Sequence, residues 1–331
     1  MMAGSKSSIK VLTEDVVERS FFRYFFRRDP VETKHLLLSR LYPHESLVGS
    51  AIVGLQTSLG TTMWENLAKG LAEKNNFRVL NPKEELLKPS VIPKAAENLI
   101  GEWGRQRDES QKKIPLDDFR RAMKKVVKSS AAPKNFKKLG KGSGADLYLV
   151  KNGAKYVFDL KTVQLNAGAG SKFNKTLMEW ITFDLFQNGV TSNLKAMLAI
   201  PYDPTSVGDW WKEFGGRVAP LDKADIKVGN EFWDFISGTH KTLEIITDVF
   251  DEMVRTEFGK HYGKLLTDHS LLAKVRHIEY QFSCSLKSKV SQITDKKTKY
   301  QWSCNSCKSI LVLSMNKIFN DEQVCSDTAC C

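Results

Sequence analysis

The chain has 331 residues, of which 41% are hydrophobic and 27% are charged, a composition typical of a globular protein with a sizeable core. Fifty Lys and Arg against 38 Asp and Glu give a formal net charge of +12, which favours a polyanionic partner. No run of 18 apolar residues occurs, and the first residues lack the apolar core of a signal peptide. We therefore expect no membrane-spanning helix and a cytoplasmic protein.

Two amphipathic helices are predicted for the N-terminal segment 14–43. Aromatic and aliphatic residues recur there at helical spacing among Arg and Glu, and Pro30 and Pro43 interrupt the pattern. Core packing is the expected use of the phenylalanines in this segment, which are Phe21, Phe22, Phe25 and Phe26.

A helix followed by a short strand is predicted within residues 58–80. The apolar residues of the helix form one stripe at i, i+3, i+4, i+7 and i+8, namely Trp64, Leu67, Ala68, Leu71 and Ala72. Glu65 lies at the edge of this stripe, so its carboxylate can reach into a site beside the sheet while the helix stays anchored. The alternative is an ordinary exposed glutamate on a helix.

Residues 105–141, which we call the basic belt, hold thirteen basic and four acidic residues. An amphipathic helix is predicted over 115–129, and a Lys- and Gly-rich loop follows it. Basic side chains massed beside carboxylates suit a phosphate backbone held next to a metal-based reaction centre. A solvated basic helix face is the alternative interpretation.

Two strands joined by a tight turn are predicted at 146–150 and 155–162. Asn152 and Gly153 both tolerate the positive φ of a type I′ turn, which is the strongest short-range signal for a β-hairpin. Side chains alternate across a strand, so Tyr156, Phe158 and Leu160 can fill a core while Val157, Asp159 and Lys161 point the other way. This places Asp159 and Lys161 about 7 Å apart, facing a common pocket.

Asp146, at the start of the first of these strands, can approach Asp159 through the hairpin. Two carboxylates brought together repel unless a cation joins them, and Mg²⁺ takes hard oxygen ligands of this kind. Such a metal lowers the pKa of a bound water and stabilises charge on a phosphate under attack. Lys161 would hold or activate the attacking water and offset the developing charge. The alternative places Asp159 and Lys161 in solvent on an edge strand.

Helices and strands continue to alternate downstream. A helix is predicted at 175–189, a buried strand within 193–204, and one or two helices over 229–259 with a turn at Ser237 and Gly238. This interleaving predicts an α/β fold with a central mixed β-sheet flanked by helices.

All six cysteines fall in the last 48 residues, so the first 283 residues fold without disulfides. Cys304 and Cys307 have the spacing of a zinc knuckle, and a second pair would come from Cys325 with Cys330 or Cys331. A structural Zn²⁺ there would stabilise a small C-terminal appendage and take no part in the chemistry. The alternative is a tail with reduced thiols.

Asp146, followed thirteen positions later by Asp159-Leu160-Lys161, resembles the motif of the PD-(D/E)XK nucleases, whose fold is restriction-endonuclease-like. The helix that carries Glu65, followed by a strand, is similar to the start of many members. The resemblance makes Asp146 and Asp159 the metal-binding acids, Lys161 the catalytic lysine and Glu65 an auxiliary acid. Ala145 departs from the pattern, because it stands where the motif has proline.

Stretches around LKAMLAIPYDP and VGNEFWDFISG resemble type II restriction endonucleases, and residues 159–180 are similar to the TdeIII-type group. The resemblance spans roughly residues 50–265. It implies Mg²⁺-dependent, sequence-specific hydrolysis of phosphodiester bonds in double-stranded DNA, a homodimer that matches a two-fold DNA site, and a cognate DNA methyltransferase as genetic partner. The subgroup implies a short palindrome of the GGNCC kind.

The expected domains are an endonuclease domain over 1–270, which includes the N-terminal helical region, and a Lys/Ser-rich, Cys-containing tail over 271–331. Phosphate or base contacts are assigned to Lys172, Asn174 and Lys175 after the catalytic strand, although helix capping or solvation explains them equally well. Two other functions remain open: a repair or junction-resolving nuclease of the same fold, and a non-catalytic DNA-binding protein.

Overall fold

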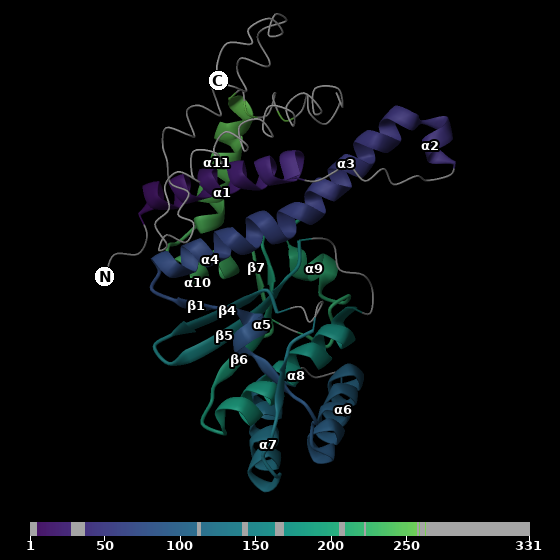
Figure 1. The fold of residues 1–331 in the computed structure, drawn as a ribbon, viewed down its shortest axis with the longest axis vertical. Helices are drawn as coiled ribbons and strands as arrows, with labels where there is room; N and C mark the ends of the chain where they lie inside the picture. Colours follow the sequence, from purple (N-terminus) through teal and green to yellow (C-terminus); the bar gives the residue numbers. More distant parts are fainter. Residues whose placement is uncertain are drawn as a thin grey trace, which may run out of the picture. The chain divides into compact units, whose positions relative to one another are not determined.

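A mixed β-sheet of five strands is the framework of the structure, a computed structural model that describes residues 5–27, 37–110, 114–140, 145–162, 169–204, 209–221, 223–256, 258 and 262 (Figure 1). The strands, in their order across the sheet, are β1 (Arg78–Leu80), β4 (Leu147–Lys151), β5 (Ala154–Leu160), β6 (Leu194–Ile200) and β7 (Ile226–Val228). The pairs β1–β4 and β4–β5 are antiparallel, whereas β5–β6 and β6–β7 are parallel. The predicted α/β fold with a central mixed sheet is therefore confirmed.

The predicted hairpin is the connection between β4 and β5. Asn152 has a φ of 50° and Gly153 a φ of 77°, as a type I′ turn requires. The turn sets the register, because Lys151 pairs with Ala154 and, further along, Leu147 pairs with Phe158.

Helices cover both faces of the sheet. On one face, α8 (Ala169–Asn188) packs over Val157 and over four residues of β6, namely Leu194, Ala196, Leu198 and Ile200. On the other face lie α4 (Glu65–Lys74) and α10 (Asn230–Ser237), and the ring of Phe158 is 5.6 Å from that of Phe232. The sequence assigned only one face of β5 to the core, but Val157 is also fully buried. Parallel pairing with β6 makes β5 an interior strand, which excludes the edge-strand alternative.

A smaller antiparallel sheet and several helices complete the structure. The small sheet joins β2 (Leu87–Pro89) to β3 (Phe136–Lys138). The accompanying helices are α5 (Pro82–Glu85), α6 (Lys94–Glu109), α7 (Leu116–Ser129) and α9 (Trp210–Phe214). Both α6 and α7 pack against α8, so the amphipathic helix predicted in the basic belt is confirmed as α7.

The chain divides into two compact units, one formed by Met1–Val17 and Thr57–Phe250 and the other by Glu18–Gln56 and Asp251–Cys331. The five-stranded sheet belongs to the first unit. The remaining helices are α1 (Lys6–Arg27), α2 (Leu38–Leu41), α3 (Pro43–Leu59) and α11 (Thr242–Arg255), and a π-helical turn, η1 (Gly60–Trp64), precedes α4. In the second unit, the ring of Tyr262 lies 5.2 Å from the rings of Phe21 and Phe25. Phe25 is buried, which confirms its predicted core packing, whereas Phe21 is half-buried.

The predicted tail, 271–331, lies outside the described residues together with all six cysteines, so the zinc site stays a prediction. None of the described helices is both long enough and apolar enough to cross a membrane.

A buried ion pair ties α6 to the strand region of the sheet. Arg107 Nη2 donates to Asp225 Oδ2 at 2.6 Å, and the two side chains are 1% and 3% exposed. Asp225 directly precedes β7, and its carbonyl accepts a hydrogen bond from the Leu198 amide. Arg107, which belongs to the basic belt, is therefore part of the fold and is not available to a polyanion.

Removing Arg107 should destabilise the protein strongly. Arg107→Ala removes the guanidinium that faces the buried Asp225 carboxylate, and breaking such a buried pair costs about 3–5 kcal/mol. The matched control is Arg105→Ala on the same helix, because Arg105 pairs with Glu109 while both side chains are 63% exposed. Such a pair contributes about 0–1 kcal/mol. Urea unfolding of the two variants measures the difference, and equal losses would contradict the structural role given to Arg107.

Candidate active site

Asp146 is held beside the end of β5 by the backbone of that strand. Its amide donates to the Phe158 carbonyl at 2.9 Å, and its Oδ2 accepts a hydrogen bond from the Leu160 amide at 2.8 Å. Asp146 thus stays bonded to β5 although it precedes the first residue of β4. The two hydrogen bonds bracket Asp159, so the carboxylates of Asp146 and Asp159 are brought together as the sequence predicted.

Asp159 is a buried acid with a cation and an anion beside it. It pairs with Leu198 in the centre of the sheet and is 3% exposed. Burial is the largest influence on its pKa and raises it. The charge of Lys161 and a hydrogen bond from its Nζ lower the pKa, and Asp146 raises it again. The balance puts the pKa of Asp159 at about 7.

Lys161 lies one residue beyond β5 but keeps the alignment of the sheet. Its amide donates to the Ala199 carbonyl at 2.9 Å, which extends the parallel pairing with β6 past the last strand residue. Its Nζ contacts Asp159 Oδ1 and lies 5.7 Å from the centre of the Phe173 ring on α8. The side chain is 29% exposed, so its ammonium group remains accessible from solvent while its stem is packed.

Glu65 reaches the same site from the other side of the sheet. It is the first residue of α4, and the predicted apolar stripe anchors this helix, because Trp64, Leu67, Ala68, Leu71 and Ala72 are all buried. Burial raises the pKa of Glu65, and the charge of Asp146 raises it further. The ion pair with Lys69, 3.4 Å away, opposes both effects. The predicted position of Glu65 at the edge of the stripe is confirmed.

The chemistry of these groups fits a hard divalent cation. Within the described ranges no set of three His, Cys, Asp or Glu residues is grouped to hold a metal ion. A Mg²⁺ ion, however, needs only one or two protein carboxylates and completes its shell with water and phosphate oxygens. Asp146 and Asp159 could supply two such carboxylates, and burial keeps the pKa of Asp159 raised despite the charge of Lys161.

The three residues predicted to contact phosphates or bases differ in their exposure to solvent. Lys172 and Lys175 are exposed on α8. Asn174 is fully buried, and neither polar atom of its amide has a hydrogen-bond partner among the described residues. The prediction of a DNA contact by Asn174 is therefore wrong, because α8 turns this side chain into the core.

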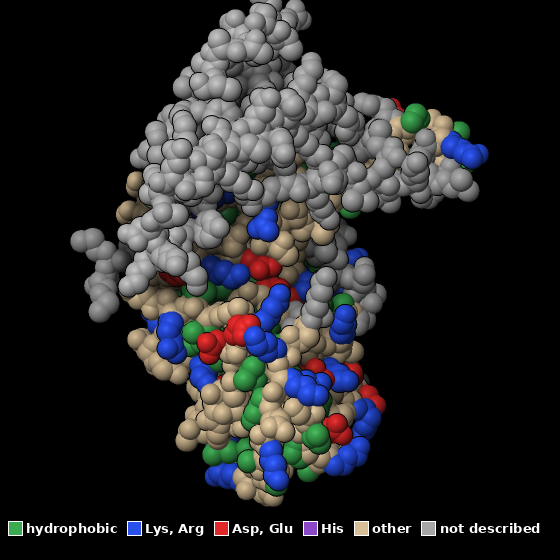
Figure 2. All heavy atoms as spheres, in the orientation of Figure 1, with side chains coloured by type: hydrophobic (Ala, Val, Ile, Leu, Met, Phe, Trp, Pro, Cys, Tyr) green, Lys and Arg blue, Asp and Glu red, His purple; other side chains and the backbone are tan. Residues whose placement is uncertain are grey.

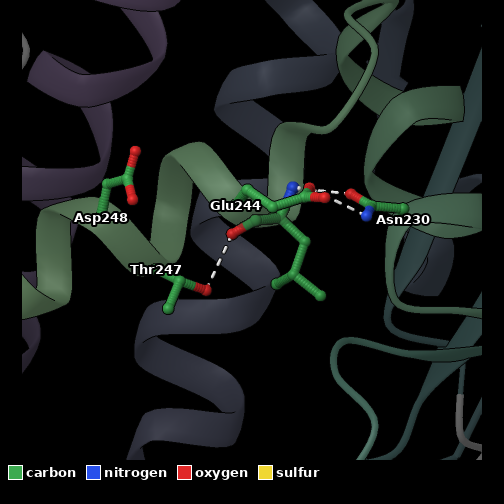
Figure 3. Close-up of a pocket in the computed structure, with 5 residues that line it drawn as sticks. Asn230, Glu244, Thr247 and Asp248 are labelled. Atoms are coloured by element: carbon green, nitrogen blue, oxygen red, sulfur yellow. Dashed lines mark hydrogen bonds between the residues drawn. The ribbon is translucent and has the colours of Figure 1, made fainter. Parts of the chain in front are cut away.

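A pocket of about 350 Å³ opens elsewhere, between the start of α10 and one face of α11 (Figure 3). Its lining residues are Asn230, Leu243, Glu244, Thr247 and Asp248. Asn230 Oδ1 accepts from the Leu243 amide, and its Nδ2 donates to Glu244 Oε2, each at 2.9 Å. Asn230 thus provides hydrogen-bond partners for the first turn of α11. We therefore assign the pocket no catalytic role.

Tyr202 is a residue at the site that the sequence analysis did not single out. It follows β6, and its hydroxyl donates to the carbonyl of Thr162, the residue after Lys161, at 3.1 Å. Only the position of this tyrosine just beyond a strand parallel to β5 could have pointed to it.

Asp146, Asp159 and Lys161 lie at the carboxyl end of the parallel strands, and the charge of Glu65 on α4 acts on the same site. This end of a parallel sheet is where ligands usually bind. With helices on both faces of a mixed sheet, this is the fold of the restriction-endonuclease-like α/β proteins.

Comparison with known proteins narrows the class. The family model of the HinfI type II restriction endonucleases matches residues 6–254, and the chain belongs to this family. The type II restriction enzyme MjaII of Methanocaldococcus jannaschii is 23% identical over 226 residues, which cover 65% of this chain and 57% of that enzyme. The chain thus spans little more than half the length of this curated relative. No solved structure matches the chain. The narrower resemblance to the TdeIII-type group is not tested by these matches and stays a prediction.

Replacing Asp159 by Asn should stabilise the metal-free protein, and more so as the pH rises. The folded-state pKa of about 7 lies above the value of about 3.9 for an unfolded aspartate, so the unfolded chain releases its proton first as the pH rises. Wild-type stability therefore falls through this window, whereas Asn does not titrate. We expect the stability gap to grow by on the order of 2 kcal/mol from pH 5 to pH 8.

Denaturant unfolding in EDTA at the two pH values measures this gap. Excess Mg²⁺ at pH 8 should stabilise the wild type alone, because a ligand that binds the folded state adds to its stability. A gap that is the same at pH 5 and pH 8 would show that Asp159 is not a buried acid of raised pKa.

Proposed function

We propose that this protein is a type II restriction endonuclease that hydrolyses phosphodiester bonds within a specific sequence of double-stranded DNA. Its membership of the HinfI family supports this function. The observation that carries it is the convergence of Asp146, Asp159 and Lys161 at one end of β5, where two hydrogen bonds and an ion pair fix them.

Each group has a distinct task in this proposal. Asp146 and Asp159 would hold Mg²⁺, and the Leu160 amide orients the Asp146 carboxylate towards that role. A bound Mg²⁺ supplies Lewis acidity to the phosphate and to the attacking water. Lys161 places its ammonium beside Asp159, where it orients the water and offsets negative charge on the phosphate. Glu65, kept close to Asp146 by α4, is the auxiliary acid.

The substrate accounts for the charge of the protein. A formal net charge of +12 attracts a polyanion over a long range, and the lysines of the basic belt supply part of it. In the face drawn in Figure 2, Lys and Arg side chains are spread over the region that holds α6 and α7, with acidic side chains among them. A homodimer would place one such site on each DNA strand, and a cognate methyltransferase would protect the host sequence.

Asp159→Ala and Lys161→Ala should each slow cleavage severely and leave DNA binding nearly intact. Either substitution removes a group that acts on the reacting phosphate, and we expect the cleavage rate to fall by about 10³-fold. Phosphate contacts elsewhere provide the affinity, so the Kd measured in Ca²⁺ should stay within about threefold. Lys212→Ala, which removes an exposed lysine, is the control and should cut like the wild type.

Phage and plasmid DNA, incubated with Mg²⁺ and then with a chelator, test the function itself. Discrete fragments that depend on Mg²⁺ support a restriction enzyme, and sequencing their ends gives the site. Cleavage of branched DNA alone would indicate a junction-resolving nuclease, and DNA that is shifted but intact would indicate a non-catalytic binder. Undiminished turnover in either active-site variant would overturn the catalytic assignment.

Arg120 and the exposed lysines of α7 should behave differently in DNA binding. Arg120 is buried and donates to Asp117, Asn193 and the Leu194 carbonyl, so it serves the fold. Lys125 and Lys128 are exposed. The double charge reversal Lys125→Glu with Lys128→Glu should weaken binding to all sequences alike. It should also reduce the slope of log K against log salt by about 1 for every phosphate that the variant no longer neutralises.

Lys74→Glu with Lys212→Glu makes the same change of charge outside the basic belt and serves as the matched control. Binding titrations from 50 to 200 mM salt separate a local contact from a general effect of net charge. An unaltered slope in the α7 variant would show that this face of α7 does not contact DNA.

A further inference from the structure

Tyr202 connects the two sides of the active site through two separate contacts. It stands two residues after β6, and its side chain is partly exposed, at 37%. Its hydroxyl donates to the Thr162 carbonyl at 3.1 Å, and Thr162 is the residue next to Lys161. Its ring lies 5.6 Å from the ring of Trp64, and Trp64 is the residue next to Glu65.

The segment that carries Tyr202 is itself fixed from the other side. Trp233 of α10, which is fully buried, donates from Nε1 to the Pro201 carbonyl at 2.6 Å. The ring of Trp233 lies 5.9 Å from that of Trp64. Because Pro201 and Trp64 are both held by one rigid aromatic side chain, Tyr202 has little freedom to shift relative to the start of α4.

The backbone at Lys161 needs such support. Beyond β5, the Lys161 amide is held by the Ala199 carbonyl, and the hydroxyl of Tyr202 then holds the carbonyl of the next residue, Thr162. The π-helical turn before Glu65 lies near the same place, since a Cβ added to Gly60 would lie 3.7 Å from Thr162 Oγ1. Single π-helical turns often occur at functional sites, where they set the direction of the residues that follow.

We propose that Tyr202 is a positioning residue that fixes Lys161 relative to Glu65, with its hydroxyl on the carbonyl of the residue after the lysine and its ring on the residue before the glutamate. The inference rests on the proposed nuclease function and deepens it. Tyr202 itself touches neither reacting group, so it acts through Lys161. A displacement of about 1 Å at a reacting group can cost about 10²-fold in rate, whereas one hydrogen bond adds little to the stability of the whole fold.

Tyr202→Phe keeps the ring and removes only the hydroxyl, and it should slow the single-turnover cleavage rate at saturating Mg²⁺ by about tenfold. The Kd for the cognate duplex in Ca²⁺ should stay within about twofold, and the melting temperature should change by no more than about 2 °C. Tyr202→Leu removes both contacts and should slow cleavage further. Tyr156→Phe removes a tyrosine hydroxyl from the other face of β5, where we expect no effect on the rate.

The outcomes separate this inference from the function on which it rests. A Tyr202→Phe protein that cuts as fast as the wild type would overturn the positioning role and leave the nuclease function standing. A rate lowered only in proportion to weaker DNA binding, or to a smaller folded fraction, would also overturn it, because both indicate a merely structural role. A wild-type protein that cuts no DNA would overturn the proposed function and this inference together.

Discussion

The burial of one carboxylate, that of Asp159, sets the constraint on which the site depends. The side chain lies near the end of an interior strand whose two faces are both covered by helices, so it cannot turn towards water. A carboxylate in such a place must take up a proton or lie beside positive charge. Lys161 provides part of that charge, and Asp146 works against it. A proton can therefore complete the site, and so can the Mg²⁺ ion that we propose for it.

The topology of the sheet explains why the residues that follow β5, β6 and β7 lie close together. β5 and β6 are parallel, so the segments that follow them leave the sheet at the same edge. Beyond β7, Gly229 has a φ of 53° and its amide donates to the Ile200 carbonyl, which lets the chain turn directly into α10. That turn brings Trp233 to the Pro201 carbonyl. Hydrogen bonds thus link the segments that follow β5, β6 and β7. The geometry of the candidate site is therefore fixed by the packed core.

The parts of the site that could be predicted from the sequence are those set by local rules. The turn at Asn152 and Gly153 fixes the register of the hairpin, and alternation along β5 then fixes which side chains share a face with Asp159. The apolar stripe of α4 likewise fixes the position of Glu65 at its edge. The contacts of Tyr202 and the burial of Asn174 could not be predicted, because they depend on which helix lies over which strand.

The charge that the basic belt offers to a partner could likewise not be predicted from the sequence. Arg107 and Arg120 both count towards the net charge of +12, yet each is buried and bonded within the fold. Burial lowers the pKa of Arg120, and the charges of Asp117 and Asp184 counter that effect. Long guanidinium groups can satisfy a carboxylate and a carbonyl at once, which suits them to tie a helix to the start of a strand. Attraction for a phosphate backbone must then come from the exposed lysines beside them, and the density of basic residues in a sequence overstates the charge that such a partner meets.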